Sequence, residues 1–270
     1  MESTLSGVTP VNPVAPYLGG KRNLARRLCA LIATIPHRTY VEPFVGMGGV
    51  FLRRGARPPV EVINDLSTDV TTLFRVARKH HEPLVEELSW LLSSRDEFER
   101  QRRVDPSTLT DIERAARFLL LQRLSFGGKV TGRTFGVDHR SPGRLNLPRL
   151  RGDLRMLRQR LERVTIERLP YADVIRRYDS PETLFYLDPP YWGCEEDYGE
   201  GTFARADFER LADQLATIAG RFVLSINDTP GAREVFRRFE IDGVETTYTL
   251  GAAHGGGKRA AELVVQGYPA

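Results

Sequence analysis

Cysteine is scarce in this chain of 270 residues, which contains only Cys29 and Cys194. Two cysteines so far apart predict no disulfide framework and favour a reducing, cytoplasmic setting. The five histidines stand without metal-ligand spacing, so we expect no structural metal. No apolar run approaches the roughly 18 residues that a membrane span needs. Residues 1–16 lack a basic and a long apolar segment, so we expect no signal peptide.

The composition is otherwise that of an ordinary globular protein, with 41% hydrophobic and 27% charged residues. The length suits one large α/β domain, or one domain that carries a sizeable insertion. The net charge of +4 is unevenly spread, because residues 99–163 hold sixteen Lys and Arg against seven Asp and Glu. A segment with an excess of nine positive charges indicates a polyanionic partner, although solvated helix faces would give the same excess.

Strand and helix patterns alternate at both ends of the chain but not in the middle. Strands are expected at 39–41, 60–64, 164–168, 184–187 and 222–226, and paired strands at 244–250 and 262–266. Between them, leucines at helical spacing and a glycine-rich hairpin over 127–136 show no second βαβ period. We therefore predict an α/β domain made of 1–67 and 164–270, with an inserted, mainly helical domain over 68–163.

A glycine-rich turn follows the first of these strands and carries Phe44, Gly46 and Gly48. Asp65 ends the next strand, 19 residues after Gly46, near the spacing at which an acidic residue accepts hydrogen bonds from ribose hydroxyls. The turn lacks the third glycine of dinucleotide loops and the Lys-Ser/Thr end of a P-loop. It therefore favours a small adenosyl ligand over a triphosphate, although Phe44 could equally be a core residue.

The most specific pattern is Asp188-Pro189-Pro190-Tyr191, which follows the apolar run at 183–187. Two prolines remove two N–H donors and fix two φ angles, so neither strand nor helix can continue. Asp188 and the Pro189 carbonyl could accept both N–H groups of an exocyclic amine and aim its lone pair at a methyl group. Tyr191 offers a face on which a purine can stack. The pattern therefore indicates methyl transfer to the amino group of a base.

The chain resembles the Dam-like family of DNA adenine-N6 methyltransferases. The matching stretches follow the family's order and lie at 17–21, 42–52, 64–65, 171–173, 188–191, 225–229 and 255–263. Individually most of them are weak signals, and together they are strong. The family often has Trp where Tyr17 stands, and the hairpin diverges strongly, which leaves the target sequence open.

The resemblance implies S-adenosylmethionine as methyl donor and a Rossmann-like methyltransferase sheet. It implies duplex DNA as the substrate from which an adenine is flipped, and 68–163 as the target recognition domain. The cofactor contacts it implies are Tyr17, Lys21, Asp65 and Asp188, and Phe44, Gly46, Gly48 and Tyr171 complete the predicted cofactor site. The catalytic residues predicted are Asp188, Pro189, Pro190 and Tyr191. The predicted DNA contacts are Arg123, Phe126, Lys129, Arg133 and Arg140.

Two alternatives remain. The same chemistry could act on cytosine N4 or on RNA adenine, although cytosine enzymes more often carry Ser, and RNA enzymes Asn, where Asp188 stands. A catalytically silent nucleic-acid-binding protein of the same fold is the other alternative, and the intact Tyr17, Lys21, Asp65 and Asp188 argue against it. The oligomeric state and the existence of a restriction partner are left open, and a monomer is compatible with the pattern.

Overall fold

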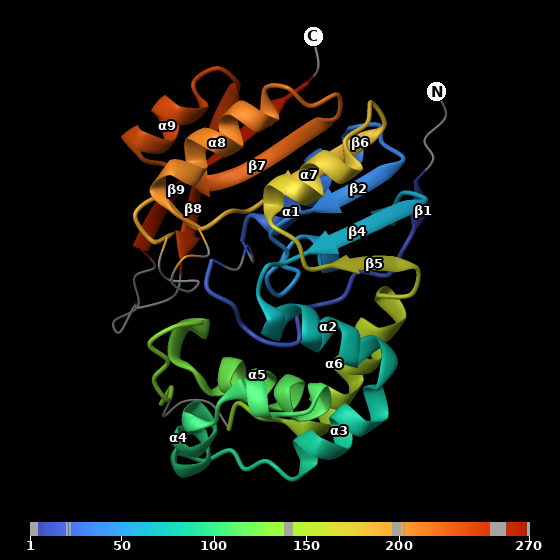
Figure 1. Cartoon of the computed structure of the whole chain (residues 1–270), viewed down its shortest axis with the longest axis vertical. Coiled ribbons are helices and arrows are strands. Elements are labelled where there is room, and N and C mark those ends of the chain that lie inside the picture. The colour runs from blue at the N-terminus through green and yellow to red at the C-terminus, as the bar shows by residue number, and fades with distance from the viewer. Residues whose placement is uncertain are drawn as a thin grey trace.

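The structure, a computed structural model, describes residues 5–19, 21, 23–137, 143–195, 201, 203–248 and 258–268. Within these residues seven strands form one sheet in the order β5-β4-β2-β6-β7-β9-β8 (Figure 1). They are β2 (Thr39–Glu42), β4 (Val60–Asn64), β5 (Val164–Glu167), β6 (Thr183–Leu187), β7 (Arg221–Asn227), β8 (Glu240–Tyr248) and β9 (Lys258–Gly267). A short pair, β1 (Ser6–Gly7) and β3 (Ala56–Arg57), stands apart from this sheet.

Five neighbouring strands run parallel and bring their carboxyl ends to one edge of the sheet. β2 pairs in parallel with β4 on one side and with β6 on the other, so the strand order reverses at β2. β5 extends the sheet beyond β4 and β7 extends it beyond β6. β9 then enters antiparallel between β7 and β8. The Rossmann-like sheet is confirmed, and ligands bind such sheets in the crevice at the reversal point.

β6 occupies the middle of the sheet because its sequence has no polar face. All five residues of its Thr-Leu-Phe-Tyr-Leu run are buried, as expected of a strand covered on both sides. Phe185 and Leu187 share a core cluster with α7 and α8, whereas Leu184 and Tyr186 share another with α1. The helices near the two faces are α1 (Ala25–Thr34), α7 (Tyr171–Tyr178), α8 (Arg205–Leu215) and α9 (Pro230–Phe236).

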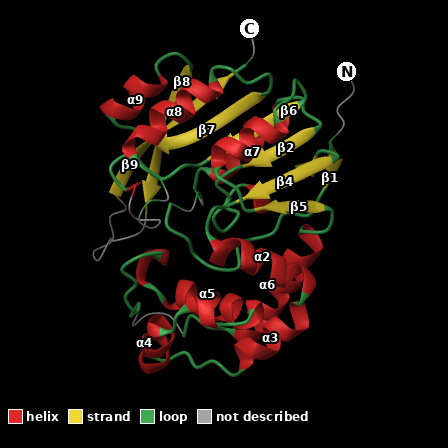
Figure 2. Ribbon diagram, in the orientation of Figure 1, coloured by secondary structure: helices red, strands yellow, loops and turns green. Residues whose placement is uncertain are grey.

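The chain between β4 and β5 is helical, as its leucine spacing predicts. It contains α2 (Thr68–Lys79), α3 (His81–Ser89), α4 (Arg95–Arg103), α5 (Asp111–Leu124) and α6 (Leu147–Arg160). Figure 2 shows these helices gathered on one side of the sheet. One continuous core cluster nevertheless includes Leu28 of α1 and Leu119 of α5. The helical character is confirmed, and a separate recognition domain over 68–163 stays a prediction.

The glycine-rich segment 127–136 differs from the β-hairpin that its sequence predicts. An antiparallel bridge between Ser125 and Phe135 is the strand pairing that the described part of this segment makes. Its first two glycines have φ of 70° and 66°, which turns the chain towards the N-terminal segment. The Leu18 N–H donates to the Gly128 carbonyl at 3.0 Å. The ends of the loop therefore pair with each other, with the Phe126 N–H donating to the Thr134 carbonyl at 2.9 Å, while its first glycines pair with a distant segment.

Two segments at the edge of the sheet lie outside long helices. The chain after the glycine-rich turn forms only a short 3₁₀ turn, η1 (Phe51–Arg53), before it reaches β3. α1 begins at Ala25, so Lys21 precedes this helix. Among the described residues, no helix has both the length and the apolarity to cross a membrane. Nor do their His, Cys, Asp and Glu side chains form a group of three that could hold a metal ion.

Candidate active site

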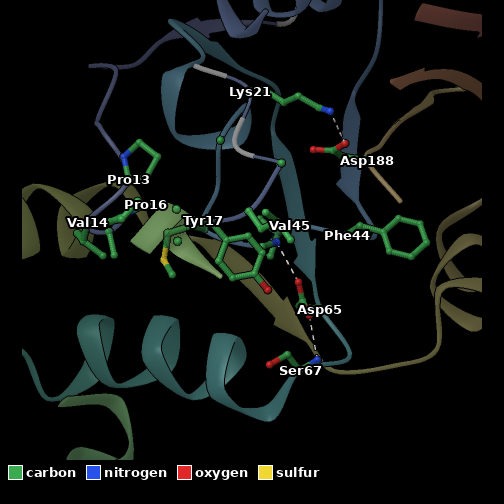
Figure 3. Close-up of a pocket in the computed structure, with 18 of the residues that line it drawn as sticks. Pro13, Val14, Pro16, Tyr17, Lys21, Phe44, Val45, Asp65, Ser67 and Asp188 are labelled. Carbon is green, nitrogen blue, oxygen red and sulfur yellow. Dashed lines mark hydrogen bonds and ion pairs between the residues drawn. The ribbon is translucent and has the colours of Figure 1, made fainter. Parts of the chain in front are cut away.

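A cavity of about 990 Å³ lies at the carboxyl edge of the sheet and extends to the helical segment (Figure 3). The predicted residues that line it are Tyr17, Lys21, Phe44, Gly46, Asp65, Arg123, Phe126, Tyr171, Asp188 and Pro190. Those that lie outside the lining are Gly48, Lys129, Arg133, Pro189 and Tyr191. Arg140 lies outside the described residues. Most of the predicted cofactor residues, which come from opposite ends of the sequence, thus meet in one place.

Asp188 follows β6 directly and carries the carboxylate at the cavity wall. Lys21 Nζ lies 2.9 Å from its Oδ1, and the Ser225 hydroxyl donates to the same oxygen at 3.4 Å. Burial raises the pKa of Asp188 to about 6, the Lys21 ammonium opposes this rise, and the charge of Glu262 adds to it. At neutral pH the carboxyl is therefore ionised and can accept hydrogen bonds.

Tyr191 is fixed through its hydroxyl group. That hydroxyl donates to Glu262 Oε1 at 2.7 Å and also contacts the Lys21 ammonium. Glu262 Oε2 in turn lies 3.3 Å from Lys21 Nζ. The side chain of Tyr191 is thus part of a polar network beside Asp188, and the stacking of a base on its ring stays a prediction.

Asp65 follows β4, the strand next to β2, and its carboxylate is held by two backbone groups. The Gly46 N–H donates to Oδ2 and the Ser67 N–H donates to Oδ1, both at 2.9 Å (Figure 3). Burial raises the pKa of Asp65 to about 6, and these two hydrogen bonds oppose the rise. The side chain is therefore locked in orientation while its remaining lone pairs can accept from a ligand.

The two predicted loop glycines have different tasks. Gly46 has a φ of 48°, and a Cβ there would lie 2.9 Å from the Tyr17 ring. The bare backbone of Gly46 therefore lets the aromatic ring of Tyr17 lie against the turn. Gly48 has a φ of 74° and faces Leu52 and not the cavity. Gly48 serves the shape of the turn, whereas Gly46 lines the cavity, and cofactor contact by either glycine stays a prediction.

An aromatic cluster forms the wall opposite Tyr17. The Phe44 ring lies 5.5 Å from the ring of Tyr171 and 5.9 Å from that of Phe203, between centroids. The Tyr171 hydroxyl donates to the Asp207 carboxylate at 3.2 Å, which anchors the ring on α8. Phe44 is therefore both packed and cavity-lining, so the two interpretations of this residue are compatible.

The predicted DNA contacts fall into two groups. Phe126 is 48% exposed at the helical side of the cavity, and Lys129 is exposed outside it. Arg123 and Arg133 are instead partly buried: Arg123 donates to the Val14 carbonyl at 2.8 Å, and Arg133 to Gln122 at 2.8 Å. These two arginines tie the loop to its surroundings, whereas Phe126 and Lys129 are accessible to a large ligand.

Sequence reasoning assigned no role to three residues in or beside the site. Glu42 ends β2 and accepts from the Tyr40 hydroxyl at 2.8 Å, and burial raises its pKa to about 8. Phe203 lines the cavity, and Glu262 is buried on β9. Glu42 could have been predicted, because a carboxylate at the end of a parallel strand lies at the edge of the sheet where ligands bind. The signal for Glu262 was its place in the matching stretch 255–263, which gave the residue no role.

The comparisons with known proteins agree with this geometry. A family model described as D12 class N6 adenine-specific DNA methyltransferase matches residues 17–250. The chain is similar to a type II methyltransferase, M1.LlaDCHI, of Lactococcus lactis subsp. cremoris, with 26% identity over 96% of both proteins. It is also similar to a DNA adenine methylase of Salmonella typhi, with 24% identity over 83% of this chain and 84% of that protein. The chain therefore belongs to the D12 class of N6 adenine-specific DNA methyltransferases.

Proposed function

We propose that the protein binds S-adenosylmethionine in this cavity, against the sheet edge, and transfers its methyl group to the N6 amino group of an adenine flipped out of duplex DNA. One observation carries the proposal: Asp188 and Asp65 line the same cavity, which also reaches Phe126 in the helical segment. The same cavity thus adjoins a carboxylate suited to ribose hydroxyls (Asp65), a carboxylate suited to an amine (Asp188) and the accessible ring of Phe126. Family membership implies both the methyl donor and a DNA substrate.

The lining suits an adenosyl ligand. S-adenosylmethionine supplies an electrophilic methyl group on a sulfonium, together with an adenine ring and a ribose diol. Tyr17, packed on Gly46, offers an aromatic face, and Asp65 offers carboxylate oxygens for the ribose hydroxyls. Phe44 and Tyr171 supply apolar walls. A volume of about 990 Å³ is at the upper end of ligand pockets, which leaves room for a base beside the cofactor.

The DNA side of the site lies in the segment 68–163, which we assign as the target recognition domain. Its charge excess supplies affinity for phosphates, which is independent of sequence. Phe126 is placed to support the strand from which a base is extruded, and Lys129 to contact the backbone. Arg123, Arg133 and Arg140 were also predicted as contacts, and the first two act by shaping the loop.

The chemical work of the chain is to orient the amine and remove a proton. Asp188 accepts one N–H of the adenine amino group, and the Pro189 carbonyl is the predicted second acceptor. This geometry turns the nitrogen lone pair towards the methyl group. As the nitrogen–carbon bond forms, the bond between the methyl carbon and the sulfonium sulfur would break, and the sulfur would leave as the neutral thioether of S-adenosylhomocysteine. The methylated amine would then carry a positive charge and lose its extra proton to Asp188 or to water. A pKa of about 6 lets Asp188 take that proton and release it again.

The test is transfer of labelled methyl groups from S-adenosylmethionine to duplex DNA, single-stranded DNA and RNA, followed by nucleoside analysis. We expect N6-methyladenine from duplex DNA, and its loss in an Asp188→Ala variant. Asp213→Ala is the matched control, because Asp213 is an exposed carboxylate on α8. N4-methylcytosine as the product, or labelling of RNA alone, would refute the proposal, as would an active Asp188→Ala enzyme.

A further inference from the structure

Lys21, Tyr191 and Glu262 form a closed polar triangle beside Asp188. The Tyr191 hydroxyl donates to Glu262 Oε1 at 2.7 Å, and Lys21 Nζ lies 3.3 Å from Glu262 Oε2 and contacts the Tyr191 hydroxyl. The third contact of this ammonium is Asp188 Oδ1, at 2.9 Å. The three N–H bonds of Lys21 thus point at two carboxylates and one phenol.

The burial of the charged Glu262 side chain is energetically unfavourable in itself. Its side chain is 1% exposed, and the side chain of Lys21 is 1% exposed as well. A buried ion pair seldom stabilises a fold more than well-packed apolar residues of the same size. Val264, the next residue on the same face of β9, is apolar and buried, so a hydrophobic residue at 262 would suit the strand. The charge at 262 therefore calls for a role in the site.

The network determines which oxygen of Asp188 faces the substrate. Both contacts that Asp188 makes with described residues, from Lys21 and from Ser225, fall on Oδ1. Oδ2 is thus the oxygen left to accept from an amine. Lys21 fixes this orientation, and the position of Lys21 is set by Glu262 and Tyr191.

The second carboxylate also limits how strongly Lys21 binds Asp188. An ammonium paired with one carboxylate alone would withdraw electron density from it and weaken it as an acceptor. Because Lys21 is shared with Glu262, Asp188 keeps more of its basicity, and the pKa of Asp188 is raised by the nearby charge of Glu262.

We propose that Glu262 is a positioning residue for methyl transfer, which holds Lys21 so that Asp188 presents Oδ2 to the adenine amino group and stays a strong acceptor. This inference rests on the proposed function of Asp188. Glu262 acts through Lys21 and Tyr191 and touches neither the base nor the methyl group.

The decisive variant is Glu262→Gln, which keeps the size and the hydrogen-bonding capacity of the side chain but removes its charge. We expect kcat to fall about tenfold, as for a misdirected catalytic group, with the KM values for S-adenosylmethionine and DNA nearly unchanged. Asp242→Asn is the matched control: it removes a carboxylate from the neighbouring strand β8, where Asp242 pairs with the exposed Arg27. This control should keep wild-type kcat.

A pH profile separates this role from a structural one. The charged and titratable groups that face Asp188 are Lys21, Glu262, Glu42 and Tyr186, with the hydroxyl of Ser225. Wild-type kcat should fall as pH drops through about 6. Loss of the charge at 262 lowers the pKa of Asp188, so the acid limb should move to lower pH while the plateau falls. Glu262→Asp keeps the charge, so its limb should stay near that of the wild type.

A cycle with Tyr191→Phe tests whether the two side chains act as one unit. The double variant should lose little more activity than Glu262→Gln alone. Wild-type kcat and pH profile in a folded Glu262→Gln enzyme would overturn the inference and leave the proposed function intact. If Glu262→Gln fails to fold, the test is Glu262→Asp, and an acid limb of this variant displaced from that of the wild type would overturn the inference. If the wild-type protein does not methylate DNA, this result would instead overturn the proposed function.

Discussion

Asn227 holds the main chain of Trp192 with both ends of its amide group. The Trp192 N–H donates to Oδ1 at 2.8 Å, and Nδ2 donates to the Trp192 carbonyl at 3.0 Å. Asn227 ends β7, and Trp192 is the residue directly after Tyr191. The neighbouring strand thus fixes the exit of the turn 188–191, which its two prolines cannot anchor through N–H groups.

Asn227→Ala should therefore loosen the catalytic turn. It removes two hydrogen bonds, so we expect the free energy of unfolding to fall by about 1–3 kcal/mol and kcat to fall about tenfold. Denaturant unfolding and steady-state kinetics measure the two effects. Thr229→Ala is the control, because it removes only the N-cap acceptor of α9 and costs about 1 kcal/mol. Equal kcat in the two variants would contradict an anchoring role for Asn227.

The rate of methyl transfer should depend on the ionisation of Asp188. Because burial raises the pKa of this carboxyl to about 6, the acceptor form is lost as pH falls through 6. Single-turnover rates between pH 5 and 8 should show one acid limb. Asp188→Asn should lower the rate by about a hundredfold or more at every pH and abolish the limb. A limb that persists in Asp188→Asn would assign it to another group.

Binding of S-adenosylmethionine should strengthen as pH rises through about 6. Ribose hydroxyls donate to ionised Asp65, whose pKa burial raises from 3.8 to about 6. The same shift means that the folded chain binds this proton more tightly than the unfolded chain, so its contribution to stability is lost as pH rises from about 4 to 6. For Asp65→Asn, calorimetric titration should give an affinity for S-adenosylmethionine that does not change with pH. At pH 8 this affinity should be about tenfold weaker than that of the wild type. Unchanged binding in this variant would exclude the ribose contact.

Lys129→Ala should weaken DNA binding by the same factor for every sequence. Lys129 is an exposed residue of the glycine-rich segment 127–136. A phosphate contact releases counterions, so loss of this contact should make the slope of log K against log salt shallower by about 0.9. Lys79→Ala is the control, since Lys79 is exposed in the last turn of α2 and lines no part of the cavity. An unaltered slope in Lys129→Ala would place the DNA elsewhere.

The sequence predicts the parts of this protein that depend on chain-local chemistry. The turn at Asp188, the glycine loop at Gly46 and Asp65 are strand-end motifs, and parallel strands bring such motifs to one edge. The predicted pairing of the last two strands, β8 and β9, is confirmed. The role of Glu262 depends instead on the antiparallel pairing of β9 with β7, which no local pattern specifies. The hairpin predicted over 127–136 is reduced to one antiparallel bridge, because Gly128 docks on Pro16 and Tyr17, more than a hundred residues away.

The segment around Tyr17 and Leu18 lies between two walls of the cavity. The Tyr17 ring packs on Gly46 at the sheet edge, while the Leu18 N–H donates to Gly128 in the loop that bears Phe126. A ligand that binds on one side of this segment orders it. A second ligand that then binds on the other side loses less of its binding energy to ordering the same segment. Thermodynamic linkage makes any such coupling reciprocal: if the methyl donor tightens the hold on DNA, DNA tightens the hold on the methyl donor by the same factor.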